Sequence, residues 1–232
     1  TEDEFVDNIP TDAKALLDAA NKLQKSAYEA FDRGDIRAAA DMTMSARQKA
    51  QEAHKIAGGS FSPEFIKNEI EQIKIASLLH DYGKIGIPDS ILKKNGSLSE
   101  VEFEVMKRHA KITHDIVSKV HFAEELADVP IIASCHHERW DGTGYPFGLA
   151  REAIPLGSRI IAVADSFDAR TTFREYKEPQ SFDEAMKEIL EESGTHFDPI
   201  VVEAFARYYR REVRPKVESG ELAEEEPDII PF

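Results

Sequence analysis

The sequence has little cysteine, a shortage of positive charge and no long apolar run. Its single cysteine, Cys135, excludes an internal disulfide and is typical of a reducing compartment, so we expect a buried filler residue in a cytoplasmic protein. Lys and Arg number 29 against 44 Asp and Glu, a net charge of −15. A surface for polymeric nucleic acid must neutralise many phosphates, which this balance argues against. Because no stretch is long enough to span a bilayer, we expect a soluble protein.

Strand-like patterns are also missing. No Val/Ile/Thr-rich alternating runs lie between turn signals, whereas apolar residues recur at three-and-four spacing along most of the 232 residues. The sequence therefore predicts an all-α protein. We expect helices at about 11–31, 36–57, 62–80, 99–121, 124–137, 157–169, 182–193 and 198–212, with loops at 82–97 and 138–156.

Three parts of the chain differ in composition. Residues 1–57 form an Ala-rich helical hairpin that turns at Arg33-Gly34-Asp35, which we interpret as an ordinary turn and not an adhesion motif. Gly58-Gly59 breaks the chain, and residues 58–216 form the main domain. Residues 217–232 are acidic and form a loosely held tail. One hairpin cannot bury its apolar face alone, so we expect the N-terminal helices to be either the stub of a signal-transmitting helix or a dimerisation element that forms a homodimer contact.

The first candidate for chemistry is His80-Asp81 at the end of an apolar-faced helix. Ile66, Ile70 and Ile73 recur at helical spacing with His80, so its imidazole is expected to point inward. This placement matters more than the dipeptide, because chance alone supplies roughly one His-Asp pair in a chain of this composition.

A second His-Asp pair, His114-Asp115, tests that distinction. It lies on a helix whose apolar stripe is formed by Val101, Val105, Ile112 and Ile116. His109 falls on this stripe, whereas His114 is turned roughly 140° away from it at about 100° per residue. We therefore select His109 as a functional residue and exclude His114.

Two further positions complete a cluster. His136-His137 ends a predicted helix, and Asp165 lies in a helix that is apolar on nearly every side, where a carboxylate is costly unless it is paired or binds a metal. Mixed imidazole and carboxylate ligands suit Fe, Mn, Zn or Ni better than Ca or Mg. There are more ligands than one ion needs, so we infer a two-metal site with Asp81 as the bridging carboxylate and a metal-bridging hydroxide as nucleophile.

Five ordered strings now resemble a known family. The strings are HDYGKIGIPDSIL, MKRHAKI, HHERWDGTGYPFGL, IPLGSRIIAVADSFDA and SGTHFDP. Together they are similar to the HD-GYP subgroup of the HD phosphohydrolase superfamily, over about residues 62–212. The resemblance implies an HD-type helical bundle around two or three ions, Fe or Mn foremost, with Zn or Ni as alternatives. It also implies hydrolysis of cyclic di-GMP to the linear dinucleotide or GMP, with cyclic GMP-AMP preferred by some relatives, and GGDEF-type or other signalling proteins as partners.

The family's functional positions carry over residue by residue. The metal ligands are His80, Asp81, His109, His136, His137 and Asp165. The substrate contacts are Lys84, Asp168, Arg174 and Lys177, and the signature loop is Gly144-Tyr145-Pro146. Asp81 and Lys84 are the expected catalytic residues, because an ammonium beside the metal site can offset charge on the leaving oxygen. Tyr145 is expected to contact the base or the phosphate.

The sequence departs from the family at one ligand. A further His, preceded by a Glu, usually lies some three dozen residues before the His-Asp pair, but here Ser45 or Met44 occupies the His position and Asp41 the Glu position. We expect Asp41 or water to complete this metal position imperfectly, and His54 to be a surface residue. Arg170, where the family prefers Leu, is expected to add a cation near Asp165 or Asp168. Two alternatives to an active phosphodiesterase stay open: a degenerate domain that binds cyclic di-GMP or a partner without turnover, and a hydrolase of another phosphoester.

Overall fold

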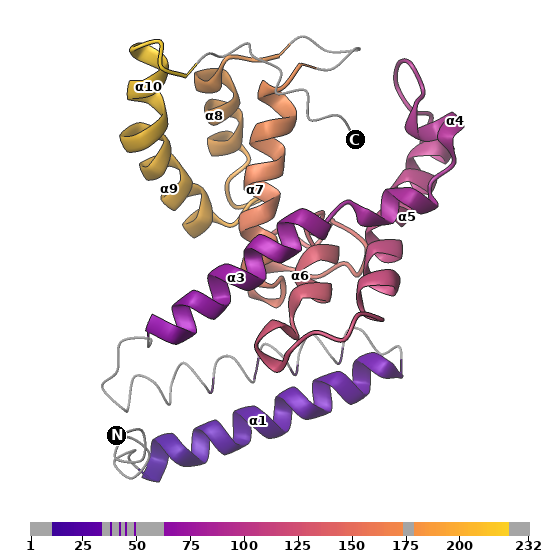
Figure 1. Ribbon diagram of the computed structural model, residues 1–232, viewed down its shortest axis with the longest axis vertical. Helices are drawn as coiled ribbons and strands as arrows, with labels where there is room; N and C mark the ends of the chain where they lie inside the picture. The colour runs from indigo at the N-terminus through magenta and orange to yellow at the C-terminus, as the bar shows by residue number, and fades with distance from the viewer. Residues whose placement is uncertain are drawn as a thin grey trace. The chain divides into compact units, whose positions relative to one another are not determined.

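The structure is a computed structural model that describes residues 11–33, 63–173 and 179–222, together with Ala38, Met42, Ser45 and Lys49 (Figure 1). The chain divides into two compact units, Thr1–Glu71 and Gln72–Phe232. The division falls inside a helix, α3 (Pro63–Leu79), whereas composition placed a domain boundary between residues 57 and 58. That boundary, and the tail at 217–232, stay predictions.

The predicted all-α class is confirmed. Within the described ranges there is no strand, only an isolated bridge between Ser193 and Phe197. The first unit contains α1 (Thr11–Asp32), the first helix of the predicted hairpin. The second helix, 36–57, lies outside the described residues except for Ala38, Met42, Ser45 and Lys49, which are helical. No helix in the described parts of the chain is long and apolar enough to cross a membrane.

The second unit begins within α3 and contains the remaining elements. Its helices are α4 (Asp89–Leu92), α5 (Glu100–Val117), α6 (Val129–Ser134), α7 (Leu156–Thr171), α8 (Phe182–Glu191), α9 (Pro199–Tyr208) and α10 (Arg214–Glu218). Three short 3₁₀ helices are η3 (Tyr82–Gly86), η4 (Glu124–Leu126) and η5 (Arg151–Ala153), and a π-helical turn at Tyr209–Val213 joins α9 to α10.

Local sequence explains where the longer helices start. The side chains of Ser99 and Ser181 each accept a hydrogen bond from the backbone N–H three residues later. In turn, the carboxylates of Glu102 and Glu184 accept the backbone N–H of these two serines. These reciprocal capping boxes fix the first turns of α5 and α8. Asp198 caps α9, with Pro199 at its first position, where a missing N–H costs nothing.

Several predicted boundaries are wrong. The predicted loop 82–97 contains η3 and α4, because Gly83 and Gly86 allow a tight turn and Pro88 precedes a new helix. The predicted loop 138–156 contains η5. The predicted helix 124–137 is divided into η4 and α6, since Pro130 restarts the helix. The His pair therefore follows α6 and does not end it.

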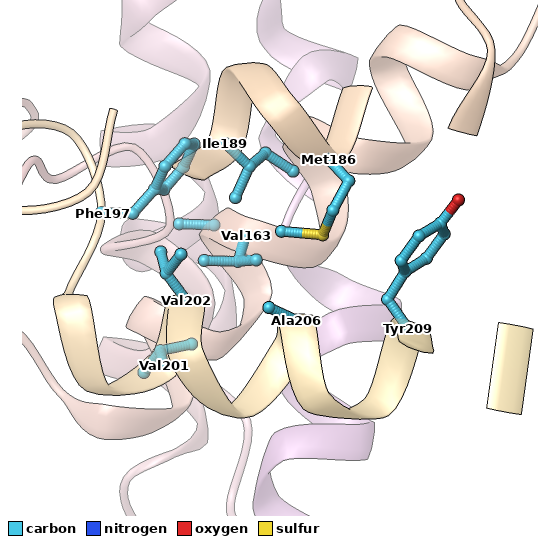
Figure 2. Packing of buried hydrophobic residues seen from close by; sticks show 9 residues of the cluster. Val163, Met186, Ile189, Phe197, Val201, Val202, Ala206 and Tyr209 are labelled. Carbon is cyan, nitrogen blue, oxygen red and sulfur yellow. The ribbon is translucent and has the colours of Figure 1, made fainter. Parts of the chain in front are cut away.

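Two clusters of buried side chains hold the second unit together. One lies between α7, α8 and α9, where Val163, Ile189 and Val202 meet Phe197 (Figure 2). The other joins α3, α5, α6 and α7 through Ala76, Val117, Ile132 and Ile161. Because α7 contributes to both clusters, it connects the helices that carry the candidate ligands to the α8–α9 pair.

The predicted apolar faces are only partly correct. Ile66 and Ile70 are each 48% exposed and Val101 is 76% exposed, although each was expected to face inward. On α3 the stripe crosses from one compact unit to the other, so its first half does not share the core that contains Ala76. Val101 lies in the first turn of α5. The buried residues of that helix begin two turns later, at His109.

A buried ion pair stabilises the C-terminal half of this unit. Arg159 on α7 donates to the Asp198 carboxylate at 2.5 Å, and their side chains are 13% and 1% exposed. The other oxygen of Asp198 accepts the Ile200 N–H at 2.8 Å. Asp198 thereby joins α7 to the start of α9.

We predict that Asp198→Ala lowers the free energy of unfolding by about 3–5 kcal/mol, because it leaves a buried guanidinium without its partner and removes a helix cap. The control is Glu203→Ala, which removes an exposed pair with Arg207 and should cost less than about 0.5 kcal/mol. Urea unfolding followed by circular dichroism measures both. Equal losses would show that the Asp198 pair contributes no more than a surface contact.

Candidate metal centre

The six predicted ligands of the second unit lie together. His80 and Asp81 follow α3, His109 is on α5, His136 and His137 follow α6, and Asp165 is on α7. The two oxygens of Asp81 lie 3.5 Å from His80 Nε2 and 3.4 Å from His109 Nε2. Asp165 Oδ1 lies 3.8 Å from His80 Nε2. The imidazole ring centres are also close, with His136 4.0 Å from His137 and 4.8 Å from His80.

Two overlapping triplets of these residues have metal-binding geometry. Ligand atoms of His109, His136 and His137 lie within 4.8 Å of one another, and so do those of His80, Asp81 and His136. His136 belongs to both triplets. The two triplets lie side by side, and because the free Nε2 of His136 can bind only one ion, His136 can serve either triplet but not both at once.

Backbone carbonyls select the ring nitrogen that each imidazole presents. The Nδ1 atoms of His80, His109 and His136 lie 2.6, 2.7 and 2.7 Å from the carbonyl oxygens of the residues three positions earlier. A carbonyl can only accept, so Nδ1 carries the proton in each ring. Nε2 is then left with a free lone pair directed at the cluster, which is the tautomer that a metal ligand requires.

Two of these Nε2 atoms have no hydrogen-bond partner among the described residues. They belong to His109 and His136, which are each 2% exposed. Leaving a buried polar atom unsatisfied costs about 1–3 kcal/mol, so such atoms call for an explanation. A divalent transition-metal ion accounts for both, because imidazole nitrogen and carboxylate oxygen are the donors it prefers. The residues present thus fit the group.

The electrostatics favour a neutral ring at His136 and His137, whereas at His80 the carboxylates of Asp165 and Asp81 outweigh burial and raise the pKa. Burial, together with the neighbouring imidazoles, lowers the pKa of His136 to about 4 and that of His137 to about 2. Burial would raise the pKa of Asp165, but His80 outweighs it and holds that pKa at about 2. Neutral imidazoles beside an ionised carboxylate are ready to bind a cation without first losing protons.

Contacts with α5 position the His80-Asp81 turn. Thr113 accepts the Gly83 N–H at 2.9 Å and donates to the His80 carbonyl at 3.0 Å. A Cβ at Gly83 would lie 2.0 Å from the His109 carbonyl oxygen, so only glycine allows this approach. Thr113 could not be singled out from the sequence, because a Thr at a helical core position has no distinctive pattern.

Lys84 lies at the edge of the cluster. Its ammonium donates to Asp81 Oδ2 at 2.5 Å, one turn after His80. Lys84 is therefore in direct contact with one of the candidate ligands. A phosphate oxygen placed beside Asp81 would be within reach of the same ammonium.

The Gly-Tyr-Pro loop folds back onto the His pair. The Tyr145 N–H donates to the His137 carbonyl at 3.2 Å, and the two rings are 4.8 Å apart. A Cβ at Gly144 would lie 2.3 Å from the Arg139 backbone nitrogen, so the close approach requires glycine. Tyr145 therefore forms one wall of the candidate metal centre.

A buried carboxylate that sequence reasoning missed fixes the end of this loop. Glu138 accepts the backbone N–H groups of Phe147, Gly148 and Leu149 at 2.6, 3.1 and 3.0 Å. A charged residue beside a His pair would ordinarily be assigned to the surface or to the metal. Its partners are main-chain groups nine to eleven positions later, which no side-chain pattern reveals.

The other predicted residues have varied positions. Asp168 is exposed and accepts from Thr172 at 3.2 Å. Asp41, His54, Arg174 and Lys177 lie outside the described residues. Cys135 is fully buried, as expected, and burial raises the pKa of its thiol.

Two predictions about single residues had different outcomes. The exclusion of His114 is correct, because it lies outside both triplets, beside Ser118 and Ser134. It is nevertheless buried, so the inner face of α5 is wider than the apolar stripe suggested.

The interpretation of Arg170 as a cation near Asp165 or Asp168 is wrong. Its guanidinium pairs with Glu188 and Glu192 of the α8 segment, at 2.9 and 3.0 Å, because that face of α7 packs against α8.

Comparison with known proteins agrees with this site. A family model described as the HD domain matches residues 62–201. A cyclic di-GMP phosphodiesterase of Thermotoga maritima is 47% identical over 156 residues, which is 62% of this chain and 40% of that protein. The response regulator RpfG of Xanthomonas campestris, also named a cyclic di-GMP phosphodiesterase, is 48% identical over 61% of this chain and 37% of its own length. A 3′3′-cGAMP-specific phosphodiesterase of Vibrio cholerae is 39% identical over 62% of this chain and 27% of that protein. The chain thus matches less than half the length of each of these relatives.

We predict that Thr113→Val, which keeps the side-chain shape, lowers the free energy of unfolding by roughly 2–4 kcal/mol, since it leaves the Gly83 N–H and the His80 carbonyl unsatisfied. It should also weaken metal binding, because the His80-Asp81 turn loses its attachment to α5. Thr113→Ser keeps the hydroxyl and serves as the control. Urea unfolding and elemental analysis of the purified variants measure the two effects. Unchanged metal content in a destabilised Thr113→Val protein would contradict the positioning role.

Proposed function

Since this chain belongs to the HD domain family, as a member of its HD-GYP group, we propose that it is a metal-dependent phosphodiesterase that hydrolyses a cyclic dinucleotide. The observation that carries the proposal is the cluster of four imidazoles and two carboxylates in which two buried Nε2 atoms have no hydrogen-bond partner among the described residues. Such a cluster is costly unless ions occupy it.

The substrate proposal rests on the relatives' names. Those reported above act on cyclic di-GMP or on 3′3′-cGAMP. We propose cyclic di-GMP as the principal substrate, with the linear dinucleotide or GMP as product. The net charge of −15 supports a small anionic ligand at a local site and not a polyanion on a broad surface.

The ligands are proposed to be His80, Asp81, His109, His136, His137 and Asp165, with Asp81 between the two ion positions. Asp81 supports this role because its two oxygens face different imidazoles, those of His80 and His109. Ions held there would lower the pKa of water and polarise the phosphodiester. We propose Fe or Mn, with Zn or Ni as alternatives, on the basis of the nitrogen and oxygen donors.

The remaining residues are proposed to bind and orient the phosphate. Lys84 is placed to contact a phosphate oxygen and offset charge as the 3′ oxygen leaves, because its ammonium lies 2.5 Å from Asp81. Tyr145 would limit the position of the ligand on the side of His137. Asp168, Arg174 and Lys177 are proposed as further substrate contacts, in line with the family.

A second candidate function has one specific observation in its favour. Ser45 or Met44 stands where the family carries another histidine ligand, with Asp41 at the place of its glutamate. A domain that binds cyclic di-GMP without hydrolysing it is consistent with that loss. Product formation by metal-loaded protein separates the two candidates. A cytoplasmic location, GGDEF-type or other signalling partners and a homodimer through the N-terminal helices stay predictions.

We predict that Lys84→Met lowers kcat for cyclic di-GMP by about 10²- to 10³-fold while metal content is unchanged, because it removes charge stabilisation but no ligand. Asp81→Asn should lower metal content and turnover together. The control is Lys93→Met, which alters an exposed ion pair with Asp89 and should have native activity. Turnover by liquid chromatography, with elemental analysis of the same samples, gives both quantities. A metal-loaded Lys84→Met protein with native kcat would remove Lys84 from the mechanism.

A further inference from the structure

A hollow at the start of α5 has no role in the function proposed so far. It has a volume of about 400 Å³ and is lined by Glu100, Val101, Phe103 and Glu104 of the first two turns of α5. Phe103 is 46% exposed and Val101 is 76% exposed. Exposed apolar side chains around a concave surface are typical of ligand sites, whereas single exposed ones need no explanation.

The polar groups at this hollow are already ordered. Lys107 Nζ lies 2.6 Å from Glu104 Oε1, 5.0 Å from the centre of the Phe103 ring and 5.6 Å from the centre of the Tyr145 ring. The ammonium is thus held between two aromatic rings by a carboxylate. An aromatic face, an anion and a cation are therefore presented within one turn of a helix.

Tyr145 connects this group to the metal centre. Its ring lies 4.8 Å from that of His137 and 5.6 Å from Lys107 Nζ, which in turn lies 5.0 Å from the Phe103 ring. Phe103, Lys107, Tyr145 and His137 therefore form a continuous chain of contacts. Burial raises the pKa of the Tyr145 phenol, and the charges of Asp81, Asp165 and Glu104 raise it further. The phenol therefore interacts electrostatically with carboxylates on two sides, those of Asp81 and Asp165 at the metal centre and that of Glu104 at the hollow.

These three groups match the edge of one base. Guanine presents N1–H and N2–H₂ donors on its Watson–Crick edge and O6 and N7 acceptors beside them, and a carboxylate can accept from both donors at once. An ammonium can donate to O6 or N7, and a ring such as that of Phe103 can stack on the base. Adenine offers an acceptor at N1 in place of a donor, which would oppose the Glu104 carboxylate.

We propose that Phe103, Glu104 and Lys107 form a guanine-binding subsite, which places one base of the substrate beside Tyr145 while its phosphate lies at the metal centre. The inference rests on the proposed function and deepens it, since it assigns the residues that select the base. Glu104 accepts from the Watson–Crick edge, Lys107 donates to O6 or N7, and Phe103 stacks on the ring.

The test compares substrates with and without bases in the metal-loaded chain of 232 residues. Glu104→Gln is expected to lower kcat/KM for cyclic di-GMP about tenfold or more, because the paired carboxylate contact is lost. Phe103→Ala is expected to lower it to a similar degree through lost stacking. Neither variant should change kcat/KM for bis(p-nitrophenyl) phosphate, a diester without a base. The native chain should prefer cyclic di-GMP to cyclic di-AMP, and Glu104→Gln should reduce that preference.

Asp115→Asn is the matched control, because it removes an exposed carboxylate that pairs with Lys111 on the same helix. It should leave both substrates unaffected. Native kcat/KM for cyclic di-GMP in both Glu104→Gln and Phe103→Ala would overturn the subsite, and so would an equal loss on the base-free diester, which would indicate damage to the metal centre. If the native chain with metal hydrolyses neither diester, the proposed function fails and the inference fails with it.

Discussion

The cost of burying an imidazole nitrogen without a partner governs the centre of this molecule. His109 and His136 use Nδ1 on carbonyls of their own helical turns, so each must direct an unprotonated Nε2 into a closed space. The same turn geometry applies to His80. A local backbone contact thus sets the tautomer, the tautomer sets the ligand atom, and three separate segments bring those atoms within a few ångströms of one another. The proposed metal binding and catalysis depend on this arrangement.

The surrounding structure holds those segments in register. Thr113 joins the His80-Asp81 turn to α5, and glycine at position 83 allows the approach. On the other side, Glu138 gathers three backbone N–H groups so that the loop with Tyr145 closes over His137. Neither contact involves a metal-binding atom, since Thr113 bonds only the main chain of His80 and Gly83. Both act through the main chain, which explains how ligands from several segments can meet at one place.

Much of the fold and the site could be predicted from the sequence, for physical reasons. Helical periodicity identified the all-α class, and placement on a helical face separated His109 from His114. The ends of elements were harder, because Pro130 and the glycines of the His80-Asp81 turn act through backbone geometry that periodicity does not describe. The partners of Arg170 could not be predicted, since its position on the same helix as Asp165 and Asp168 does not reveal that the α8 segment supplies Glu188 and Glu192. Thr113 and Glu138 could not be found, because their partners are main-chain atoms.

The most direct measurement is anomalous diffraction from crystals of the chain grown with Mn²⁺. We expect two neighbouring peaks, one within ligand distance of Nε2 of His109 and the other within ligand distance of His80 and Asp81, with His136 beside both. Ions bound elsewhere, or hydrogen bonds from protonated Nε2 atoms in a metal-free cluster at saturating Mn²⁺, would contradict this expectation.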